Sequence, residues 1–398
     1  MRSLLYSLLL LIPYITSAPT EPHTDENPWG EYAAHCRVEE QPYLYSTADS
    51  TQVQWHDIDL DLSPHDMWRE VATQYKEKMV RGIGIVHTMV STVGGDDAWN
   101  MLLDIMSGAP DKFTPPYNDE IKAMADLTGI AVEELTLLNL FYEIAKACTS
   151  LVAMDVNGKI YHGRNLDFGL FFLWDTEKKE WELTDALRDL TVNYNFKKDG
   201  KTLFKAVTFA GHLGILTAVR PNAYTLSTDT RFGSTLDTLT DFFLNGLQGR
   251  QFLLYAYRDM FTNIATFDEA RDYIKNLPLF AQGYVIMGST DTGVIITRSY
   301  NGTDHEQFID KKQKNGWYVL ETNYDWDKPD IYLDDRTIPG NNCMQQLTQK
   351  RVSKEGLYQV LSSKTTLNKA TVYTAIMSVD DGTIETFLRT CEDPCWFV

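Results

Sequence analysis

The chain of 398 residues predicts an α+β fold in which two packed sheets have helices on their outer faces. Two observations predict this class. Residues 30–147 are mainly helical in pattern, whereas the rest of the chain is richer in strands. Helical patterns then interrupt those strands, as expected where helices cover a sheet. No internal repeat, low-complexity tract or long linker divides the chain, so we expect one large domain or two closely packed parts.

The first part of the chain contains four amphipathic segments, in which apolar residues recur at helical spacing. They cover residues 66–80, 97–106, 119–126 and 132–146. The last of them leads up to Cys148, and the residues after that cysteine read as a strand. We therefore expect Cys148 where a helix gives way to a strand.

Apolar runs and alternating patterns predict strands through the rest of the chain. They cover residues 149–156, 159–162, 190–196, 202–209, 214–219, 223–227, 284–287, 293–298, 317–322, 371–379 and 383–388. Helical spacing returns at residues 234–247, 252–262, 267–276 and 356–363.

Residues 1–18 have the layout of a secretory signal peptide, with Arg2 before a short apolar core and small residues at the end. No later stretch approaches the run of about 20 apolar residues that spans a bilayer. We therefore expect a soluble mature protein in an oxidising compartment. Asn301, in Asn-Gly-Thr, then predicts a glycosylated surface turn, with an unmodified loop asparagine as the alternative.

Five cysteines fit such a compartment, and their odd number leaves one thiol over. Four partners admit three pairings. Cys391 and Cys395 are close enough for a disulfide that closes a small loop. Cys36 would then pair with Cys343, which leaves Cys148 as a thiol.

The chain is strongly acidic, with a net charge of −19 and an isoelectric point near 4.8. It would be repelled by nucleic acid and by anionic lipid at neutral pH. We expect no nucleic-acid partner, and we expect the repulsion from anionic lipid to vanish near pH 4.5.

Cys148 is followed by Arg164 and Asp167 at a spacing that suggests an N-terminal-nucleophile hydrolase inside a precursor. Cutting the peptide bond before Cys148 would place a thiol and an α-amine on one residue. An α-amine has a reference pKa of about 7.7 to 8, so it can serve as the base for the thiol. The alternative for any single cysteine is a buried, inert thiol.

Competing catalytic signatures are missing from the sequence, which has no Gly-x-Ser-x-Gly elbow, no His-Glu-x-x-His helix and no phosphate-binding Gly-rich loop. The eight histidines are scattered, which argues against a zinc cluster. We expect neither a metal nor an organic cofactor.

Several motifs taken together resemble the acid ceramidase family, which is related to N-acylethanolamine acid amidase and more distantly to bile-salt hydrolases. They are Cys148-Thr149-Ser150, HGRNLDFG at 162–169, ETNYD at 321–325, LDDR at 333–336 and DPC at 393–395. The likeness covers nearly all of the chain after the signal peptide. The long segment between Phe168 and Leu190 and the C-terminal cysteine pair resemble the ceramidase branch.

The resemblance implies an αββα sandwich, with two antiparallel sheets between helices, and self-cleavage between Ala147 and Cys148. The products would be a helical α chain, residues 19–147, and a catalytic β chain, residues 148–398, joined by a disulfide between Cys36 and Cys343. The implied reaction is hydrolysis of ceramide to sphingosine and a fatty acid in lysosomes, with secretion as a second destination. The implied partners are a saposin-type lipid carrier and anionic membrane lipids.

The resemblance also assigns roles to residues near the nucleophile. Cys148 would attack the acyl carbonyl and form a thioester, while its α-amine carries the proton. Arg164 would stabilise the thiolate, or else form a structural ion pair with Asp167. Asp167 would accept a hydrogen bond from the Cys148 ammonium. Residues three apart on a straight strand point to opposite faces, so both would serve one site only if the chain bends near Asn165.

Two residues from later in the chain complete the implied site. Asn323 would donate its side-chain N–H to the oxyanion, or it is a turn residue after the preceding strand. Arg336 would be a further site arginine, or the partner of Asp334 or Asp335 in an ordinary salt bridge.

The run Asp229-Thr230-Arg231-Phe232 departs from the family, which carries a glutamate just before the arginine. Thr230 cannot act as a carboxylate. Either Asp229 takes over from the adjacent position, or that carboxylate is dispensable here.

Two other functions compete with ceramide hydrolysis. The first is hydrolysis of N-acylethanolamines by the same residues, and the second is an uncleaved lipid-binding protein in which Cys148 is inert. An enzyme acting on ceramide also needs an apolar channel, for which aromatic residues near Cys148 are candidates, although core packing is their more common fate. These are Phe141, Tyr142, Phe168, Phe171, Phe172 and Trp174.

Overall fold

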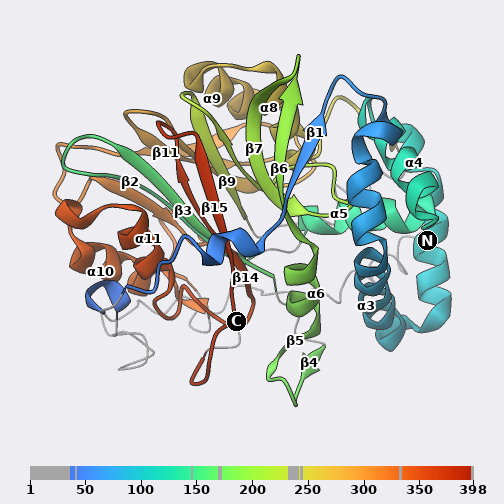
Figure 1. The fold of residues 1–398 in the computed structure, drawn as a ribbon, viewed down its shortest axis with the longest axis horizontal. Helices are drawn as coiled ribbons and strands as arrows, with labels where there is room; N and C mark the ends of the chain where they lie inside the picture. Colours follow the sequence, from blue (N-terminus) through green and yellow to red (C-terminus); the bar gives the residue numbers. More distant parts are fainter. Residues whose placement is uncertain are drawn as a thin grey trace.

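Two sheets packed face to face form the centre of the molecule, and helices cover their outer faces (Figure 1). This is the layered α+β class that the sequence predicts. The computed structural model describes residues 36–40, 43–144, 147–168, 173–231, 242, 245–330 and 334–395. The expected signal peptide, residues 1–18, and most of the helix expected at 234–247 lie outside these ranges.

The larger sheet has eight strands, and the chain runs antiparallel between all neighbours except the first two. In spatial order they are β1 (Trp55–Asp59), β6 (Thr191–Lys198), β7 (Lys201–Phe209), β8 (Thr217–Arg220), β9 (Tyr224–Thr230), β10 (Gly283–Gly288), β11 (Gly293–Arg298) and β12 (Thr303–Phe308). β1 pairs in parallel with β6. The mainly helical first part of the chain therefore also contributes an edge strand, which the sequence reading missed.

The smaller sheet has five antiparallel strands. In spatial order they are β13 (Tyr318–Glu321), β2 (Ala147–Met154), β3 (Ile160–Asp167), β14 (Thr371–Ser378) and β15 (Thr383–Leu388). β2 and β3 lie in the middle, with one face against the larger sheet and the other against helices, so almost every residue in them is buried. For this reason β2 reads as a continuous apolar run rather than as an alternation.

Pairs of helices form the outer layers. α8 (Leu253–Asn263) and α9 (Phe267–Asn276) lie over the larger sheet, and α10 (Thr337–Leu347) and α11 (Lys354–Leu361) lie over the smaller one (Figure 1). The Asn165 amide of β3 donates a hydrogen bond of 2.8 Å to Leu361 O at the end of α11, which fixes this layer to the sheet. Across the described residues, no helix is both long enough and apolar enough to cross a bilayer.

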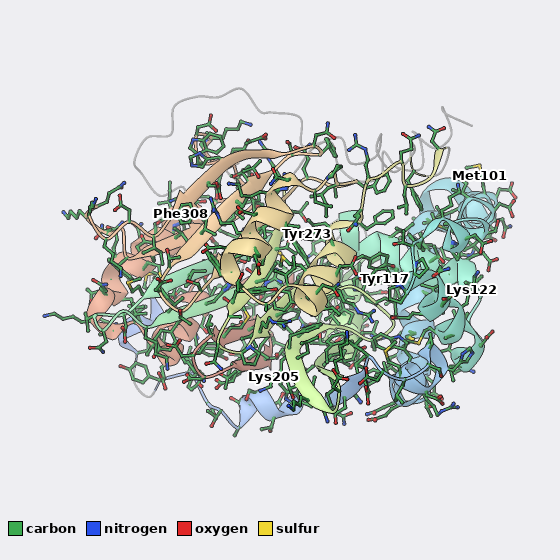
Figure 2. The ribbon with its side chains drawn as sticks, turned by 90° about the horizontal axis from the view of Figure 1, so that it is seen from above. Met101, Tyr117, Lys122, Lys205, Tyr273 and Phe308 are labelled. Carbon is green, nitrogen blue, oxygen red and sulfur yellow. A yellow bond between two sulfur atoms is a disulfide. The ribbon has the colours of Figure 1, made fainter. Side chains whose placement is uncertain are left out.

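Three further helices pack together at one end of the molecule. They are α3 (Pro64–Ser107), α4 (Tyr117–Thr128) and α5 (Val132–Ile144). Figure 2 shows this end, marked by Met101 and Lys122, on the opposite side from Phe308 at the end of β12. The segments predicted at 66–80 and 97–106 both lie in α3, where Gly95 has non-helical backbone angles (φ 71°, ψ 177°) and divides it into two limbs.

Short elements complete the chain. They are η1 (Arg37–Glu39), η2 (Asp49–Gln52), η3 (Pro110–Lys112), η5 (Gln349–Arg351), the hairpin of β4 (Trp174–Asp175) and β5 (Glu180–Trp181), and α6 (Glu182–Leu190). α6 packs between α3 and β14.

Two disulfides tie distant or terminal segments together. Cys36, just before η1, pairs with Cys343 in α10, and Cys391 pairs with Cys395. Both pairings agree with the sequence prediction, and Cys148 is in neither. Hydrogen bonds reinforce the first link, because Gln359 of α11 donates to Arg37 O over 2.6 Å. The first described residues are therefore fastened to the helices over the smaller sheet.

Candidate active site

Cys148 is the second residue of β2 and is completely buried between the two sheets. α5 ends at Ile144, so the change from helix to strand falls within a few residues of Cys148, as expected. Ala147 precedes it in the same strand. Side chains from three other segments contact its sulfur, its backbone nitrogen and its carbonyl oxygen.

Arg164, on the neighbouring strand β3, holds the sulfur. Its Nη2 donates to Cys148 Sγ over 2.8 Å and to Thr228 O over 3.1 Å, and its Nη1 donates to Thr217 Oγ1 over 2.7 Å. The guanidinium is completely buried, so strands of both sheets fix its position. A permanent cation in contact with sulfur favours the thiolate, which is the nucleophilic form of cysteine.

Asn323 contacts the backbone nitrogen of Cys148. It lies in the turn after β13, with a φ of 86°, and its Oδ1 accepts a hydrogen bond of 2.7 Å from Cys148 N. Its Nδ2 donates to Thr230 O over 2.7 Å. Asn323 is thus both a turn residue and part of the site, and its side-chain oxygen is the atom in contact with Cys148 N.

Glu321 holds this turn in place. Its Oε1 accepts hydrogen bonds from the backbone nitrogens of Thr322, Asn323 and Tyr324, over 3.0, 2.9 and 3.1 Å. Three donors converging on one oxygen fix a tight turn, because each would otherwise be buried without an acceptor. The orientation of Asn323 toward Cys148 follows from this arrangement.

Arg336, the residue before α10, contacts the other side of Cys148. Its Nη1 donates to Cys148 O, and its Nη2 donates to Asn323 Oδ1 over 2.9 Å. Asp334 pairs with it through both oxygens, each at 2.9 Å. The salt bridge considered as an alternative is therefore present, and Arg336 reaches the nucleophile as well.

Asp167 lies beyond Arg336. Its Oδ2 is 3.8 Å from Arg336 Nη1 and accepts a hydrogen bond of 3.0 Å from Asn368 Nδ2. Its Oδ1 is buried and has no hydrogen-bond partner among the described residues. Burial raises the pKa of Asp167 to about 6, although the charge of Arg336 opposes the shift.

No bend near Asn165 is needed to bring Arg164 and Asp167 into one site. β3 continues as a strand through Asp167, so the two side chains leave it on opposite faces. Arg164 points toward the larger sheet and reaches the sulfur, whereas Asp167 pairs with Arg336 beside the Cys148 backbone. The ion-pair partner of Arg164 is Asp229 of β9, at 3.7 Å, and not Asp167.

Asp229 is completely buried beneath the nucleophile. Its Oδ1 accepts a hydrogen bond of 2.7 Å from Ser150 Oγ on β2, two residues after Cys148. Ser150 in turn accepts from Ser227 Oγ over 2.8 Å, and Ser227 lies 2.8 Å from His162 Nε2. A chain of polar side chains thus runs between the sheets from His162 to Asp229.

The other predicted residues are placed as follows. Asn301 is exposed in the turn between β11 and β12, where a glycan would meet no obstacle from burial. Phe168 is buried in the core, and Trp174 packs against Trp181 in the small hairpin. The structure does not describe the side chains of the other candidates, which are Phe141, Tyr142, Phe171 and Phe172.

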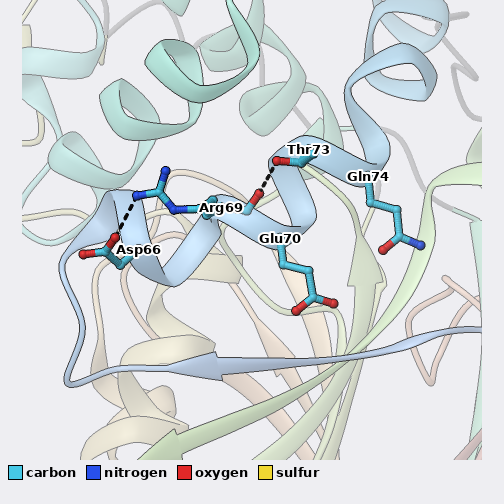
Figure 3. Close-up of a pocket in the computed structure, with 5 residues that line it drawn as sticks. All are labelled: Asp66, Arg69, Glu70, Thr73 and Gln74. Carbon is cyan, nitrogen blue, oxygen red and sulfur yellow. Dashed lines mark hydrogen bonds and ion pairs between the residues drawn. The ribbon is translucent and has the colours of Figure 1, made fainter.

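A surface hollow lies on α3, away from Cys148. It has a volume of about 550 Å³ and is lined by polar residues of the first turns, Asp66, Arg69, Glu70, Thr73 and Gln74 (Figure 3). Asp66 and Arg69 are already paired with each other at 2.7 Å. None of the lining residues belongs to the Cys148 site, so this hollow is not its substrate entrance.

Sequence reasoning missed several supports of the site. Glu321 lies inside a quoted motif, but nothing in the motif assigns it a role in holding Asn323. Thr217 and Tyr373, which hydrogen-bond Arg164, lie on β8 and β14. A lone threonine or tyrosine in a strand carries no local signal that could have singled it out.

Comparisons with known proteins agree with this geometry. A sequence profile for linear amide C–N hydrolases of the choloylglycine hydrolase family matches residues 148–324, which begin at Cys148 and include Asn323. A profile for the beta subunit of N-acylethanolamine-hydrolyzing acid amidase matches residues 51–113.

Relatives match over almost the whole chain. "Probable acid ceramidase" of Caenorhabditis elegans is 36% identical over 397 residues, which cover 98% of each chain. Acid ceramidase of Homo sapiens is 34% identical over 393 residues and 97% of each chain. Among solved structures, the Caenorhabditis elegans N-acylethanolamine-hydrolyzing acid amidase ortholog is 28% identical with a TM-score of 0.52, covering 61% of this chain and 100% of that one.

The sandwich of two sheets and the buried cysteine at the start of the hydrolase profile define an amide hydrolase with the N-terminal-nucleophile fold. At 34–36% identity over nearly the full length of its relatives, the chain belongs to the acid ceramidase family.

Proposed function

We propose that this protein hydrolyses ceramide to sphingosine and a free fatty acid, after cutting its own chain between Ala147 and Cys148. The observation that carries the proposal is the 2.8 Å contact between Arg164 Nη2 and Cys148 Sγ, in a site where Asn323 and Arg336 also hold Cys148. Ceramide is the substrate class because the relatives that match the full chain are named acid ceramidases.

Self-cleavage uses the same thiol as turnover. The Cys148 sulfur attacks the carbonyl carbon of Ala147, the peptide C–N bond breaks, and the nitrogen leaves with a proton as a new α-amine. Water then hydrolyses the thioester to give the Ala147 carboxylate and the thiol. The contacts that hold Cys148 N and Cys148 O in the uncut chain support this step, because they fix the residue on either side of its sulfur-bearing carbon.

Turnover follows the same pattern with the lipid amide. The Cys148 thiolate attacks the acyl carbonyl, the C–N bond breaks, and sphingosine leaves with a proton from the α-ammonium. Water hydrolyses the acyl thioester, and the α-amine accepts the proton that water gives up. Asn323 Oδ1 already accepts one hydrogen from the Cys148 nitrogen, and we assign to Asp167, which pairs with Arg336, the role of accepting a hydrogen that cleavage adds.

The tetrahedral intermediate needs hydrogen-bond donors. An amide nitrogen carries two hydrogens, and Asn323 Nδ2 gives one of them to Thr230 O. Its second N–H, with no acceptor recorded among the described residues, is the donor that we assign to the oxyanion.

The cut would divide the molecule into a helical α chain, residues 19–147, and a catalytic β chain, residues 148–398. The disulfide between Cys36 and Cys343 joins these two segments, so the products would stay covalently linked. Residues 1–18 would direct the precursor to the secretory route, with the lysosome as its destination and secretion as a second one.

Parallel assays of two lipid amides test the proposal. Acid-matured protein should hydrolyse ceramide faster than palmitoylethanolamide near pH 4.5, and Cys148→Ala should neither mature nor turn over either lipid. Clear preference for the ethanolamide would move the protein to the acylethanolamine branch. A profile and a solved structure of that branch both match this chain, which is why this outcome is tested. Ceramide hydrolysis by Cys148→Ala would refute the nucleophile.

Access to a lipid substrate implies partners at a membrane surface, namely anionic lipids and a saposin-type carrier. The net charge of −19 repels anionic bilayers at neutral pH, and protonation of carboxylates removes that repulsion in acid. Binding to anionic vesicles, measured by co-sedimentation, should therefore rise sharply between pH 7.4 and 4.5. Equal binding at the two pH values would contradict this expectation.

A further inference from the structure

The two arginines of the site differ in how their charges are balanced. Arg336 is paired with both oxygens of Asp334, at 2.9 Å each. Arg164 has no such dedicated carboxylate: its Nη2 lies 2.8 Å from Cys148 Sγ and 3.7 Å from Asp229 Oδ1. The sulfur and Asp229 therefore compete for one positive charge.

The polar chain beneath the site runs in one direction. Ser227 donates its hydroxyl hydrogen to Ser150, and Ser150 donates its own to Asp229 Oδ1. His162 Nε2 lies 2.8 Å from Ser227 Oγ, and the neutral tautomer with its hydrogen on Nε2 supplies the first donor of the chain. Burial and then the charge of Arg164 lower the pKa of His162 to about 3, so the ring is neutral.

The second oxygen of Asp229 shows which protonation state this environment favours. Oδ2 is buried and has no hydrogen-bond partner among the described residues. An ionised oxygen without a donor costs more to bury than an uncharged hydroxyl without an acceptor, and the neutral acid keeps Oδ1 as the acceptor for Ser150. Burial raises the pKa of Asp229 to about 6, against the opposing charge of Arg164.

Other titratable and charged groups also face Asp229. They are Cys148, Arg164, Asp167 and Glu321 on strands of the smaller sheet, and Arg336 just before α10. His162 is linked through Ser227, and Tyr284 lies opposite Asp229 on β10. Apart from the two arginines and the Cys148 α-ammonium that maturation would add, none of these groups brings a positive charge to Asp229, because His162 is neutral.

We propose that Asp229 is a positioning residue that confines turnover to acidic conditions by acting through Arg164. Protonated, it leaves the guanidinium charge to the Cys148 sulfur and to the anion that forms during acyl transfer. Ionised, it draws on the same charge and adds a negative charge beside that anion, which raises the barrier. This inference rests on the proposed function, in which Cys148 is the nucleophile.

The test is the pH profile of ceramide hydrolysis by matured Asp229→Asn, in which the side chain keeps its shape but cannot ionise. The alkaline limb of kcat/KM should move upward by about one pH unit, so that the ratio of activity at pH 7 to that at pH 5 rises roughly tenfold. Ser150→Ala, which removes the donor that stabilises ionised Asp229, should move the limb in the same direction by a smaller amount. Asp380→Asn, the same exchange in an exposed turn, should leave the profile in place.

Two outcomes would overturn the inference. The Asp229→Asn profile could coincide with that of the unmodified protein, or the variant could be folded and matured yet inactive at every pH, which would mean that the ionised carboxylate is required. Should Asp229→Asn fail to fold, an unmoved or acid-shifted limb in Ser150→Ala would refute it equally well. Activity in Cys148→Ala would instead refute the proposed function, so the two failures are distinguishable.

Discussion

At the scale of single residues, three side chains contact different atoms of Cys148. Arg164 hydrogen-bonds its sulfur, Asn323 its backbone nitrogen and Arg336 its carbonyl oxygen. The sequence motifs predicted that these residues meet. They could not predict which atoms face each other, because the orientation of Asn323 depends on Glu321 and Thr230, and these lie on other parts of the fold. Asn323 Oδ1 accepts the peptide N–H of Cys148, whereas the role predicted for Asp167 concerns the ammonium that cleavage would create.

The Asp exchange at Asn323 separates its two functions. Asn323→Asp keeps an oxygen for the Cys148 nitrogen but removes both N–H donors, so oxyanion stabilisation should be lost. We expect kcat of matured protein to fall on the order of 100-fold to 1,000-fold. Asn263→Asp, the same change at the exposed end of α8, should leave kcat as it is. A loss smaller than about tenfold at Asn323 would remove the residue from the oxyanion role.

At the scale of elements, the sequence predicts those with a strong periodic pattern and misses those without one. The bounds predicted for β11, β15 and α9 are the observed ones, because each has a clean pattern between turn residues. β1 has only five residues and alternating burial, which leaves too few apolar positions for recognition. α10 contains the run Pro339-Gly340-Asn341-Asn342, whose residues are poor helix formers, so its packing on β13 outweighs its propensity.

The turn after β13 depends on one carboxylate. Glu321→Ala would leave three backbone N–H groups without their acceptor, two of them buried and each of those at a cost of about 1 to 3 kcal/mol. We expect a loss of at least about 2 kcal/mol in the free energy of unfolding, measured by denaturant titration, together with loss of turnover. Glu321→Gln keeps an acceptor oxygen and should lose less, and Glu177→Ala in an exposed turn should lose neither. Full activity in Glu321→Ala would show that Asn323 does not need this support.

At the scale of the whole molecule, buried carboxyl groups make the fold suited to acid. Burial raises the pKa values of Asp167, Asp229 and Asp330 to about 6. A carboxyl whose pKa is raised in the folded state stabilises the fold below its unfolded pKa, and that contribution is lost as the pH rises through about 6. Asp325 has the opposite effect, because its pKa is lowered to about 2: burial opposes the change, but hydrogen bonds led by Arg231 outweigh it. Its contribution to stability is therefore lost only as the pH falls below about 4 and through about 2.

The midpoint of thermal unfolding should therefore be higher near pH 5 than near pH 7.5, as measured by calorimetry on matured protein. Asp229→Asn should reduce the difference between the two midpoints, because the amide cannot ionise. A midpoint that rises toward neutral pH would show that the paired surface carboxylates outweigh the buried ones.

If the chain is cut between Ala147 and Cys148 as proposed, the parallel pairing of β1 with β6 has a consequence for the order of folding and cleavage. β1 lies before the proposed cleavage point and β6 lies after it. In the same way Glu120 lies before this point and Arg258 after it, and the two form a buried ion pair with a contact of 2.8 Å. If the two segments were synthesised as separate chains, each would lack its partner. An unpaired edge strand of the larger sheet would be exposed and Arg258 would lack its carboxylate, and both would favour aggregation before the chains associate. A continuous chain brings these segments together in one molecule, so the proposed cleavage would have to follow folding.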